Sequence, residues 1–234
     1  MLQALLFDLD GTLANTDPIH YQTWKDVLKP YGIEIDRPFY DSRFSGRLNI
    51  DIVKNLLPQL SLEEGSALSR FKEAEFRNRA TNALKPMPGL FDVMQWADEQ
   101  GLKKAIVTNA PAENAVFLLQ VLGLEHRFET VVLGDELPKG KPDPMPYQVA
   151  LAELHVPAEE AIAFEDSPSG IRSAVSAGIL TVGIASTQAL QDLHDLGASL
   201  VVADFTAPQL ADLLRRDTTQ NTPDSTSHGA SSFC

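Results

Sequence analysis

The sequence is poor in several features that would point to particular classes of protein. It has one cysteine in 234 residues, Cys234, at the end of the chain. A lone thiol excludes an intramolecular disulfide, a cysteine-built metal site and a cysteine nucleophile within the fold. Basic residues are also scarce, with 19 lysines and arginines against 32 aspartates and glutamates, which gives a net charge of −13. This balance argues against nucleic acid or an anionic membrane as a general partner, so an anionic substrate must meet local cations or a metal.

Long apolar runs are absent as well. The apolar start of the chain ends at Phe7 and Asp8, whereas a secretory signal has a basic start and a longer apolar stretch. No segment approaches the roughly 20 apolar residues of a membrane span. Together with the single thiol, this predicts a soluble, cytoplasmic protein. The length and an apolar content of 44% predict one or two folded domains with a sizeable core.

Short apolar runs alternate with amphipathic helical patterns along most of the chain. Because buried parallel strands read as nearly continuous apolar runs, we expect an α/β fold: a Rossmann-like, doubly wound parallel sheet with helices on both faces. Two helical patterns end at Gly101 and Gly123, a residue type that commonly closes helices. The expected strands are residues 4–7, 105–109, 131–133, 161–164, 180–184 and 200–202, and helices are expected at 90–100, 112–122 and 146–154.

Residues 16–85 interrupt this alternation, because they contain no convincing strand pattern. We therefore expect an inserted α-helical cap over 16–85 and a catalytic core formed by 1–15 and 86–216, with Pro58 and Gly65 as interruptions of the helical patterns. Pro86 and Pro88 would stiffen the second crossing between the two parts. The polar residues 217–234 predict a disordered tail. The expected cap helices are residues 19–29, 39–44, 49–57 and 62–80.

The strongest chemical signal directly follows the first expected strand, where the chain reads Phe-Asp-Leu-Asp-Gly-Thr-Leu. It places two carboxylates, Asp8 and Asp10, at the carboxyl end of a strand, where ligands collect in an open parallel sheet. Aspartates also cap turns at strand ends, so this run alone leaves a structural and a functional interpretation open.

Three later strand ends carry complementary groups. Thr108 and Asn109 can bind phosphate oxygens, although a helix N-cap explains them equally simply. Lys141 lies between prolines on a stiff loop and can offset the charge of a phosphate and of an attacking carboxylate, unless the loop is merely solvated. Glu165 and Asp166 are an acid pair suited to a hard cation, and helix capping accounts for only one of them.

These groups should meet at one point, because the carboxyl ends of the strands converge on one crevice in a doubly wound sheet. Several carboxylates at such short range repel one another unless a cation lies among them. Mg²⁺ takes oxygen ligands and keeps positions for water and phosphate. The sequence therefore predicts Mg²⁺ as the cofactor.

Taken together, the four motifs resemble the haloacid dehalogenase superfamily, specifically its helical-cap phosphatases and β-phosphoglucomutases, over about residues 1–214. The resemblance implies that Asp8 is the nucleophile that forms an aspartyl phosphate and that Asp10 is the general acid and base. The presence of Asp10 argues against a hydrolytic dehalogenase, which lacks this residue and the metal. The resemblance further implies phosphate binding by Thr108, Asn109 and Lys141, and Mg²⁺ binding by Asp8, Asp10 through its carbonyl, Asp166 and Glu165.

Substrate choice should lie in the cap, because the core supplies only phosphate chemistry. A histidine and a cap lysine of β-phosphoglucomutases occupy positions similar to His20 and Lys72, although both also fit plain helix faces. Arg47, in a Ser-Gly-Arg run, is the candidate for a second anionic group, yet Asn49 stands where a mutase would carry arginine. Trp24, one turn after His20, is a further candidate that equally fits a core position.

The sequence thus predicts a Mg²⁺-dependent phosphatase for a small phosphorylated metabolite, with a sugar phosphate as the expected substrate. The alternative is a β-phosphoglucomutase-like enzyme that uses the same intermediate. A phospho-accepting receiver domain also carries an acid pair, a threonine and a lysine, but its acceptor aspartate lies on a later strand and it has no inserted cap. No nucleic acid, membrane or obligate protein partner is expected.

Overall fold

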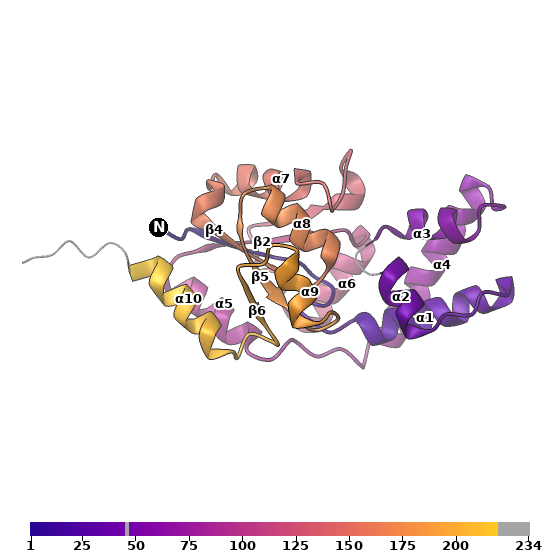
Figure 1. Ribbon diagram of the computed structural model, residues 1–234, viewed down its shortest axis with the longest axis horizontal. Helices are drawn as coiled ribbons and strands as arrows, with labels where there is room; N and C mark the ends of the chain where they lie inside the picture. Colours follow the sequence, from indigo (N-terminus) through magenta and orange to yellow (C-terminus); the bar gives the residue numbers. More distant parts are fainter. Residues whose placement is uncertain (45–46, 220–234) are drawn as a thin grey trace, which may run out of the picture.

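A parallel sheet lies at the centre of the structure. The computed structural model describes residues 1–44 and 47–219, the last three by their backbone alone, and its strands pair in parallel in the order β3-β2-β1-β4-β5-β6. The predicted α/β fold class is confirmed, with helices flanking the sheet (Figure 1). The strands are β1 (Ala4–Phe7), β2 (Lys103–Thr108), β3 (Thr130–Leu133), β4 (Ala161–Glu165), β5 (Leu180–Ile184) and β6 (Leu200–Val202).

The strand order reverses at β1, which lies between β2 and β4. Phe7 is in register with Ile106 on one side and with Phe164 on the other. All residues of β1 and β4 are buried, because helices cover both faces of the sheet. In open sheets of this kind, ligands bind beyond the carboxyl ends of the strands at the point of reversal. The chain therefore leaves β1 directly into the expected site.

Two apolar cores hold the helices on the sheet. On one face, α5, α6 and α10 pack against residues such as Phe7 and Phe164, whose stacked rings have centroids 4.9 Å apart. On the other face, α7 and α8 cover Leu6 and Ala163. The bounds are α5 (Leu90–Glu99), α6 (Ala112–Leu122), η2 (Gly134–Glu136), α7 (Met145–Leu154), η3 (Ala158–Glu160), α8 (Pro168–Ser176), α9 (Leu190–Asp195) and α10 (Pro208–Thr219).

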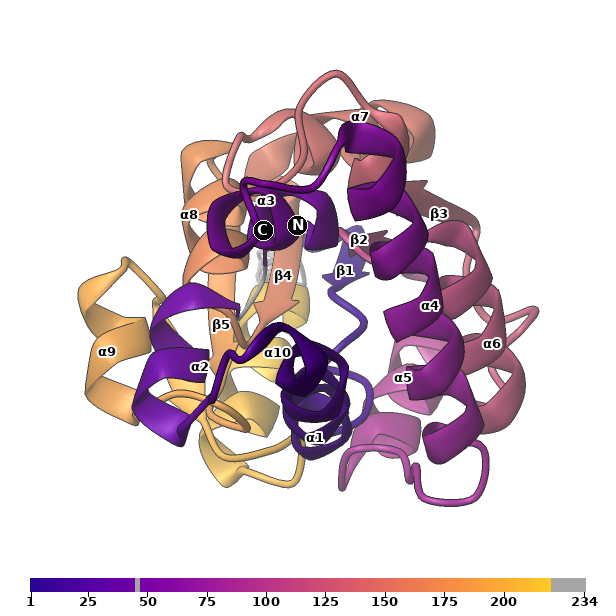
Figure 2. The ribbon, with the colours of Figure 1, turned by 90° about the vertical axis from the view of Figure 1, so that its right-hand side faces the viewer.

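The helices that follow β1 form a small core of their own. Trp24 is 2% exposed and packs there with Tyr40, Phe44 and Val53. Figure 1 shows these helices gathered beyond one end of the sheet, and Figure 2 shows them in front of the ends of β1 and β4. The bounds are α1 (Asp17–Leu28), η1 (Lys29–Tyr31), α2 (Arg37–Arg43), α3 (Asn49–Leu56) and α4 (Leu62–Ala80).

Two details differ from the sequence-based expectations. Gly65 lies inside α4 and does not interrupt it. A Cβ at this position would stand 3.3 Å from Val53, so glycine here allows α3 to pack closely on α4. The disordered tail expected from residue 217 does not begin there, because α10 is anchored by buried Leu210 and Leu214 and continues to Thr219. The rest of the expected tail, 220–234, lies outside the described residues.

The two chain crossings between the sheet and α1–α4 lie side by side. Ala14 forms an antiparallel bridge with Pro86, and the Met87 N–H donates to the Leu13 carbonyl at 2.7 Å. These bonds join the two crossings where the helical segment leaves the sheet, close to the end of β1. Within the described chain, none of the helices combines the length and the apolar character that a bilayer-spanning segment requires.

Candidate active site

The end of β1 brings both aspartates of the first motif to the point where the strand order reverses. The Asp8 N–H still donates to the Phe164 carbonyl of β4 at 3.0 Å, which continues the sheet pairing to the first acid. Gly11 then turns with φ 80°, and a Cβ there would stand 2.1 Å from Asp166 Oδ2. Only glycine therefore allows this turn to approach the second acid pair so closely.

Lys141 lies at the centre of the core site and is buried. Its Nζ donates to Asp8 Oδ1 at 2.7 Å, to the Val107 carbonyl at 2.6 Å and to Glu165 Oε1. Burial alone would lower the pKa of this lysine, but the negative charges of Asp8 and Glu165 outweigh that effect and raise it. Lys141 is therefore a fixed cation beside the carboxylate that the sequence predicts as the nucleophile.

Glu165 is fully buried, and its carboxylate is held by several donors. Tyr147 Oη donates to Oε1 at 2.7 Å, next to the Lys141 bond, and Ser167 Oγ donates to Oε2 at 3.4 Å. The start of α8 fits closely around the group, since a Cβ on Gly170 would stand 1.8 Å from Oε2. These contacts give Glu165 a role in holding Lys141, while its role as a metal ligand stays a prediction.

The acids fit a divalent cation. Asp8, Glu165 and Asp166 each offer an oxygen, and these atoms lie within 4.8 Å of one another. Burial, followed by the charge of Glu165, raises the pKa of Asp8 to about 7. Burial and the charge of Asp8 likewise raise the pKa of Asp166 well above its usual range. Carboxylates this costly to ionise together are stabilised by a hard cation, which binds oxygen ligands.

Asp166 and Asp10 face different neighbours. Thr187 Oγ1 donates to Asp166 Oδ2 at 2.8 Å, a contact from the loop after β5 that the sequence did not indicate. The Asp10 side chain instead meets His20, with Oδ1 3.1 Å from Nε2. The Asp10 carboxyl therefore contacts the helical segment and is not part of the cluster of Asp8, Glu165 and Asp166, while its role as general acid and base stays a prediction.

The predicted phosphate-binding residues lie at the end of β2. Thr108 is buried and its Oγ1 accepts from the Ala110 N–H at 3.0 Å, a bond within the turn after β2. The N-cap of α6 is Pro111, so Thr108 does not fill the helix-capping role that the sequence left open. Asn109 bonds the Lys141 backbone twice: its Oδ1 accepts from the N–H at 3.0 Å, and its Nδ2 donates to the carbonyl at 3.1 Å. Asn109 thus fixes the lysine loop, a task that the sequence analysis missed, and phosphate binding by both residues remains a prediction.

Two predicted residues of the helical segment, His20 and Lys72, lie next to Asp10. Lys72 Nζ donates to His20 Nδ1 at 2.7 Å, so the opposite ring nitrogen carries the proton and donates to Asp10. The His20 ring stacks on Phe76, with centroids 3.8 Å apart. Trp24 belongs to the small apolar core and presents its ring to Lys72 Nζ at 5.2 Å. His20 and Lys72 are therefore joined to the site by direct contacts.

Arg47 lies apart from this chain of contacts. Its side chain is exposed, borders the same cavity, and donates weakly to the Ser42 carbonyl at 3.5 Å. The cavity has a volume of about 570 Å³ and runs from Asp8 to the helical segment. Residues 45 and 46 of the Ser-Gly-Arg run lie outside the described residues.

Comparison with known proteins places the chain in a family. The family model for haloacid dehalogenase-like hydrolases matches residues 5–184. A phosphorylated carbohydrates phosphatase from Thermotoga maritima is 32% identical over 76% of this chain and 82% of its own length. A β-phosphoglucomutase from Bacillus subtilis is 30% identical over 86% of this chain and 89% of its own length.

The fold has a close counterpart among solved structures. A HAD hydrolase of family IA, variant 3, from Entamoeba histolytica superposes on this chain with a TM-score of 0.82 and is 28% identical in sequence. The match covers 92% of this chain and 100% of the other. Fold, motifs and sequence relatives therefore agree: the chain is an enzyme that belongs to the haloacid dehalogenase-like hydrolase family.

Proposed function

We propose that the protein is a Mg²⁺-dependent phosphatase that hydrolyses a small sugar phosphate through an aspartyl phosphate on Asp8. The observation that carries this proposal is the ion pair between Asp8 Oδ1 and Lys141 Nζ, 2.7 Å long, at the floor of the cavity. A carboxylate attacks phosphorus only when nearby positive charge screens their repulsion, and Lys141 is fixed where it can do so.

The reaction takes two steps on this chain's residues. Asp8 attacks phosphorus and forms an O–P bond while the bond to the sugar oxygen breaks, and Asp10 gives its proton to that leaving oxygen. Asp10 then accepts a proton from water as the water oxygen attacks the aspartyl phosphate, which releases phosphate and restores Asp8. His20 holds Asp10 through the 3.1 Å contact with its Oδ1. When bound, Mg²⁺ would be held by Asp8, Asp166 and the Asp10 carbonyl, and it would supply charge neutralisation for the phosphoryl oxygens.

A sugar phosphate is the proposed substrate class. The relative from Thermotoga maritima is named for phosphorylated carbohydrates, and the cavity offers polar groups far from Asp8 for a hydroxylated substrate. Thr108 is proposed to bind the transferred phosphoryl group. His20, Trp24, Lys72 and Arg47 are proposed to contact or orient the remainder of the substrate.

A phosphosugar mutase is the second candidate, because a named β-phosphoglucomutase matches 86% of the chain. Asn49 favours the phosphatase over the mutase. It stands where a mutase would carry arginine, yet it has no positive charge and donates to Glu73. Incubation with Mg²⁺, β-glucose 1-phosphate and a trace of bisphosphate primer separates the two. A mutase yields glucose 6-phosphate, and a phosphatase releases inorganic phosphate.

Metal removal and substrate screening test the main proposal. A panel of phosphorylated metabolites, read out by phosphate release, should contain one or more sugar phosphates that the enzyme hydrolyses in Mg²⁺. Chelation with verified metal removal should abolish this activity and added Mg²⁺ should restore it. Full activity without metal would contradict the cofactor, and hydrolysis confined to other phosphate esters would contradict the substrate class.

A further inference from the structure

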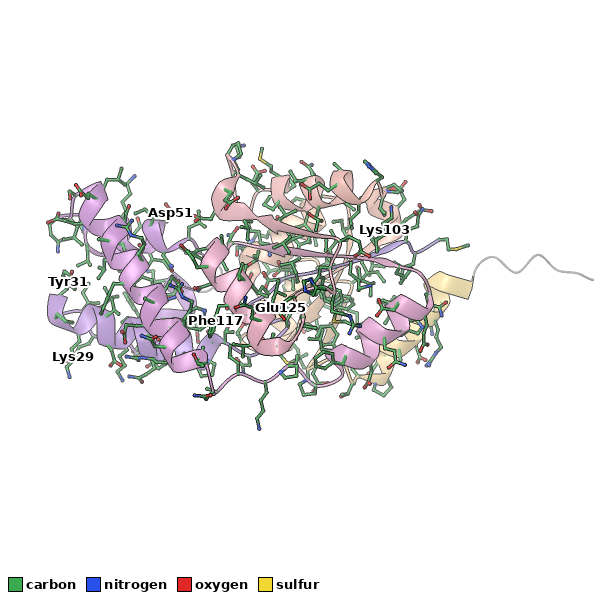
Figure 3. All side chains as sticks on the ribbon, turned by 180° about the vertical axis from the view of Figure 1, so that it is seen from behind. Lys29, Tyr31, Asp51, Lys103, Phe117 and Glu125 are labelled. Atoms are coloured by element: carbon green, nitrogen blue, oxygen red, sulfur yellow. The ribbon has the colours of Figure 1, made fainter. Side chains whose placement is uncertain are left out.

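A buried polar bridge joins α4 of the helical segment to α6 of the sheet layer. Glu73 on α4 and Asn114 on α6 are 5% and 1% exposed. Asn114 Nδ2 donates to Glu73 Oε2 at 2.5 Å, and Arg77 Nη1 donates to Asn114 Oδ1 at 2.6 Å. The two helices lie side by side (Figures 2 and 3). Both the nitrogen and the oxygen of the Asn114 amide are thus bonded to residues of α4, which belongs to the helical segment.

The donors to Glu73 come from three different helices. Lys72 of α4 donates to Oε1 at 2.7 Å, Asn49 of α3 donates to the same oxygen, and Asn114 of α6 donates to Oε2. A buried carboxylate that loses a donor is destabilised, because its desolvation is no longer offset. Of these donors, only Asn114 comes from outside the helical segment. Movement of α4 away from α6 would therefore leave Oε2 without this bond and leave Arg77 without its acceptor.

Glu73 is also the anchor of the contacts that lead to Asp10. Its Oε1 accepts from Lys72, Lys72 donates to His20 Nδ1, and His20 Nε2 meets Asp10 Oδ1. Each contact in this series is 3.1 Å or shorter. The position of α6 against α4 is therefore connected, bond by bond, to the orientation of the proposed acid and base.

We propose that Glu73 and Asn114 are positioning residues: their contact between α4 and α6 holds Lys72, and through Lys72 it orients His20 and Asp10. This inference rests on the proposed function of Asp10. The contact between α4 and α6 bears on proton delivery, because the Glu73 carboxylate makes both the bond to Asn114 and the bond to Lys72.

An exchange of the two side-chain types tests the pair. Asn114→Asp places two carboxylates in contact, and Glu73→Gln removes the charge that holds Lys72. The double variant restores one amide and one carboxylate in reversed order, so the contact between α4 and α6 can form again. Glu75→Gln, on the same helix and paired with Arg79 at 3.9 Å, is the control for a lost acid outside the bridge.

The probes are p-nitrophenyl phosphate and phenyl phosphate, whose leaving oxygens differ in basicity. We expect Asn114→Asp to lower kcat/KM about tenfold or more on phenyl phosphate, and the double variant to recover most of that loss. The loss should be smaller on p-nitrophenyl phosphate, because its weakly basic leaving group needs little help from an acid. Glu75→Gln should match the wild type on both esters.

Two results would overturn the inference: losses of the single variants that simply multiply in the double variant, or equal losses on the two esters. If Asn114→Asp does not fold in a thermal melt, the cycle Glu73→Ala, Asn114→Ala and their double replaces it, with multiplicative losses again as the contradicting result. Failure of the proposed function is recognised separately, because wild type would then hydrolyse neither ester or Asp8→Asn would keep full activity.

Discussion

At the scale of single residues, the core site is a balance of charges in a small buried volume. Lys141 Nζ lies between Asp8 and Glu165, and Asp166 lies close to both acids. One lysine does not neutralise this group, which is why burial and mutual repulsion hold the pKa of Asp8 at about 7. Substitutions that remove one of the acidic charges here should therefore change activity far more than stability.

The first prediction follows for Asp8→Asn. The amide keeps the size of the side chain but cannot attack phosphorus, so activity should fall by about a thousandfold or more. The melting temperature should stay level or rise, because a buried carboxylate among other carboxylates is removed. Phosphate release and a thermal melt measure the two effects. Well-folded protein with near-normal turnover would disprove the aspartyl phosphate.

A second prediction at this scale concerns the pH dependence of the Glu73 contribution. Burial alone would raise its pKa, but Lys72 and His20 outweigh burial and lower the pKa from 4.5 to about 2. A lowered folded-state pKa gives stability that is complete above the unfolded value and is lost as the pH falls toward the folded one. Glu73→Gln should therefore melt lower than wild type at pH 7 by a gap that stays constant down to about pH 5.

Below that pH the gap should shrink, because protonated Glu73 loses its attraction to Lys72 while glutamine does not titrate. Melting temperatures at pH 7, 5, 4 and 3 measure it. Glu75→Gln, whose partner contact is half-exposed, should show little gap at any of these values. A Glu73→Gln gap that is unchanged at pH 3 would mean that charge is not what stabilises the bridge.

At the scale of elements, buried strands are the part of the fold that sequence predicts well. Their apolar runs locate each strand to within about two residues, because burial on both faces leaves few polar positions. The missed residues are informative: β2 begins at Lys103 and Lys104, two charged residues that the apolar pattern omits. Lys104 is buried but reaches Asp98, while Lys103 lies at the end of the sheet away from α1–α4 (Figure 3).

Some contacts between elements follow from the sequence patterns, and others do not. The strand-end motifs gather as predicted because parallel strands share one edge, so Asp8, Lys141 and Asp166 meet. Nothing in the local pattern shows that Glu73 faces Asn114, because both look like ordinary helix residues and their contact depends on how α4 docks on α6. The adjacent Lys72 and Glu73 are likewise indistinguishable by sequence from a solvated pair on a helix surface.

The third prediction belongs to an element, the first turn of α8. Gly170→Ala improves helix propensity, but its Cβ would stand 1.8 Å from the Glu165 carboxylate. Glu165 must shift and carry Lys141 with it, so kcat/KM should fall by about tenfold or more. Arg172→Ala, exposed on the same helix, is the control and should leave activity unchanged. Normal kinetics for Gly170→Ala would show that α8 yields without disturbing the lysine.

At the scale of the whole molecule, the helical segment adds cations to a protein of net charge −13. The core site already uses its lysine on Asp8 and Glu165, so a distant part of an anionic substrate must be met from the other side of the cavity. Arg47 borders that cavity, and its guanidinium donates to the Ser42 carbonyl over a long distance, 3.5 Å. A segment joined to the sheet by two paired crossings can bring such a group over bound substrate.

The last prediction is that Arg47→Ala separates substrates by their size. For the sugar phosphate found by screening, kcat/KM should fall about ten- to a thousandfold, a loss of about 1.4–4 kcal/mol of transition-state binding. Hydrolysis of p-nitrophenyl phosphate should change little, because this ester has no distal polar group for the guanidinium to bind. Arg43→Ala, which removes an exposed arginine over the Phe39 ring, is the matched control and should affect neither substrate. Equal losses on both substrates would place Arg47 in the fold or the core chemistry, and the helical segment would then not select the substrate through this residue.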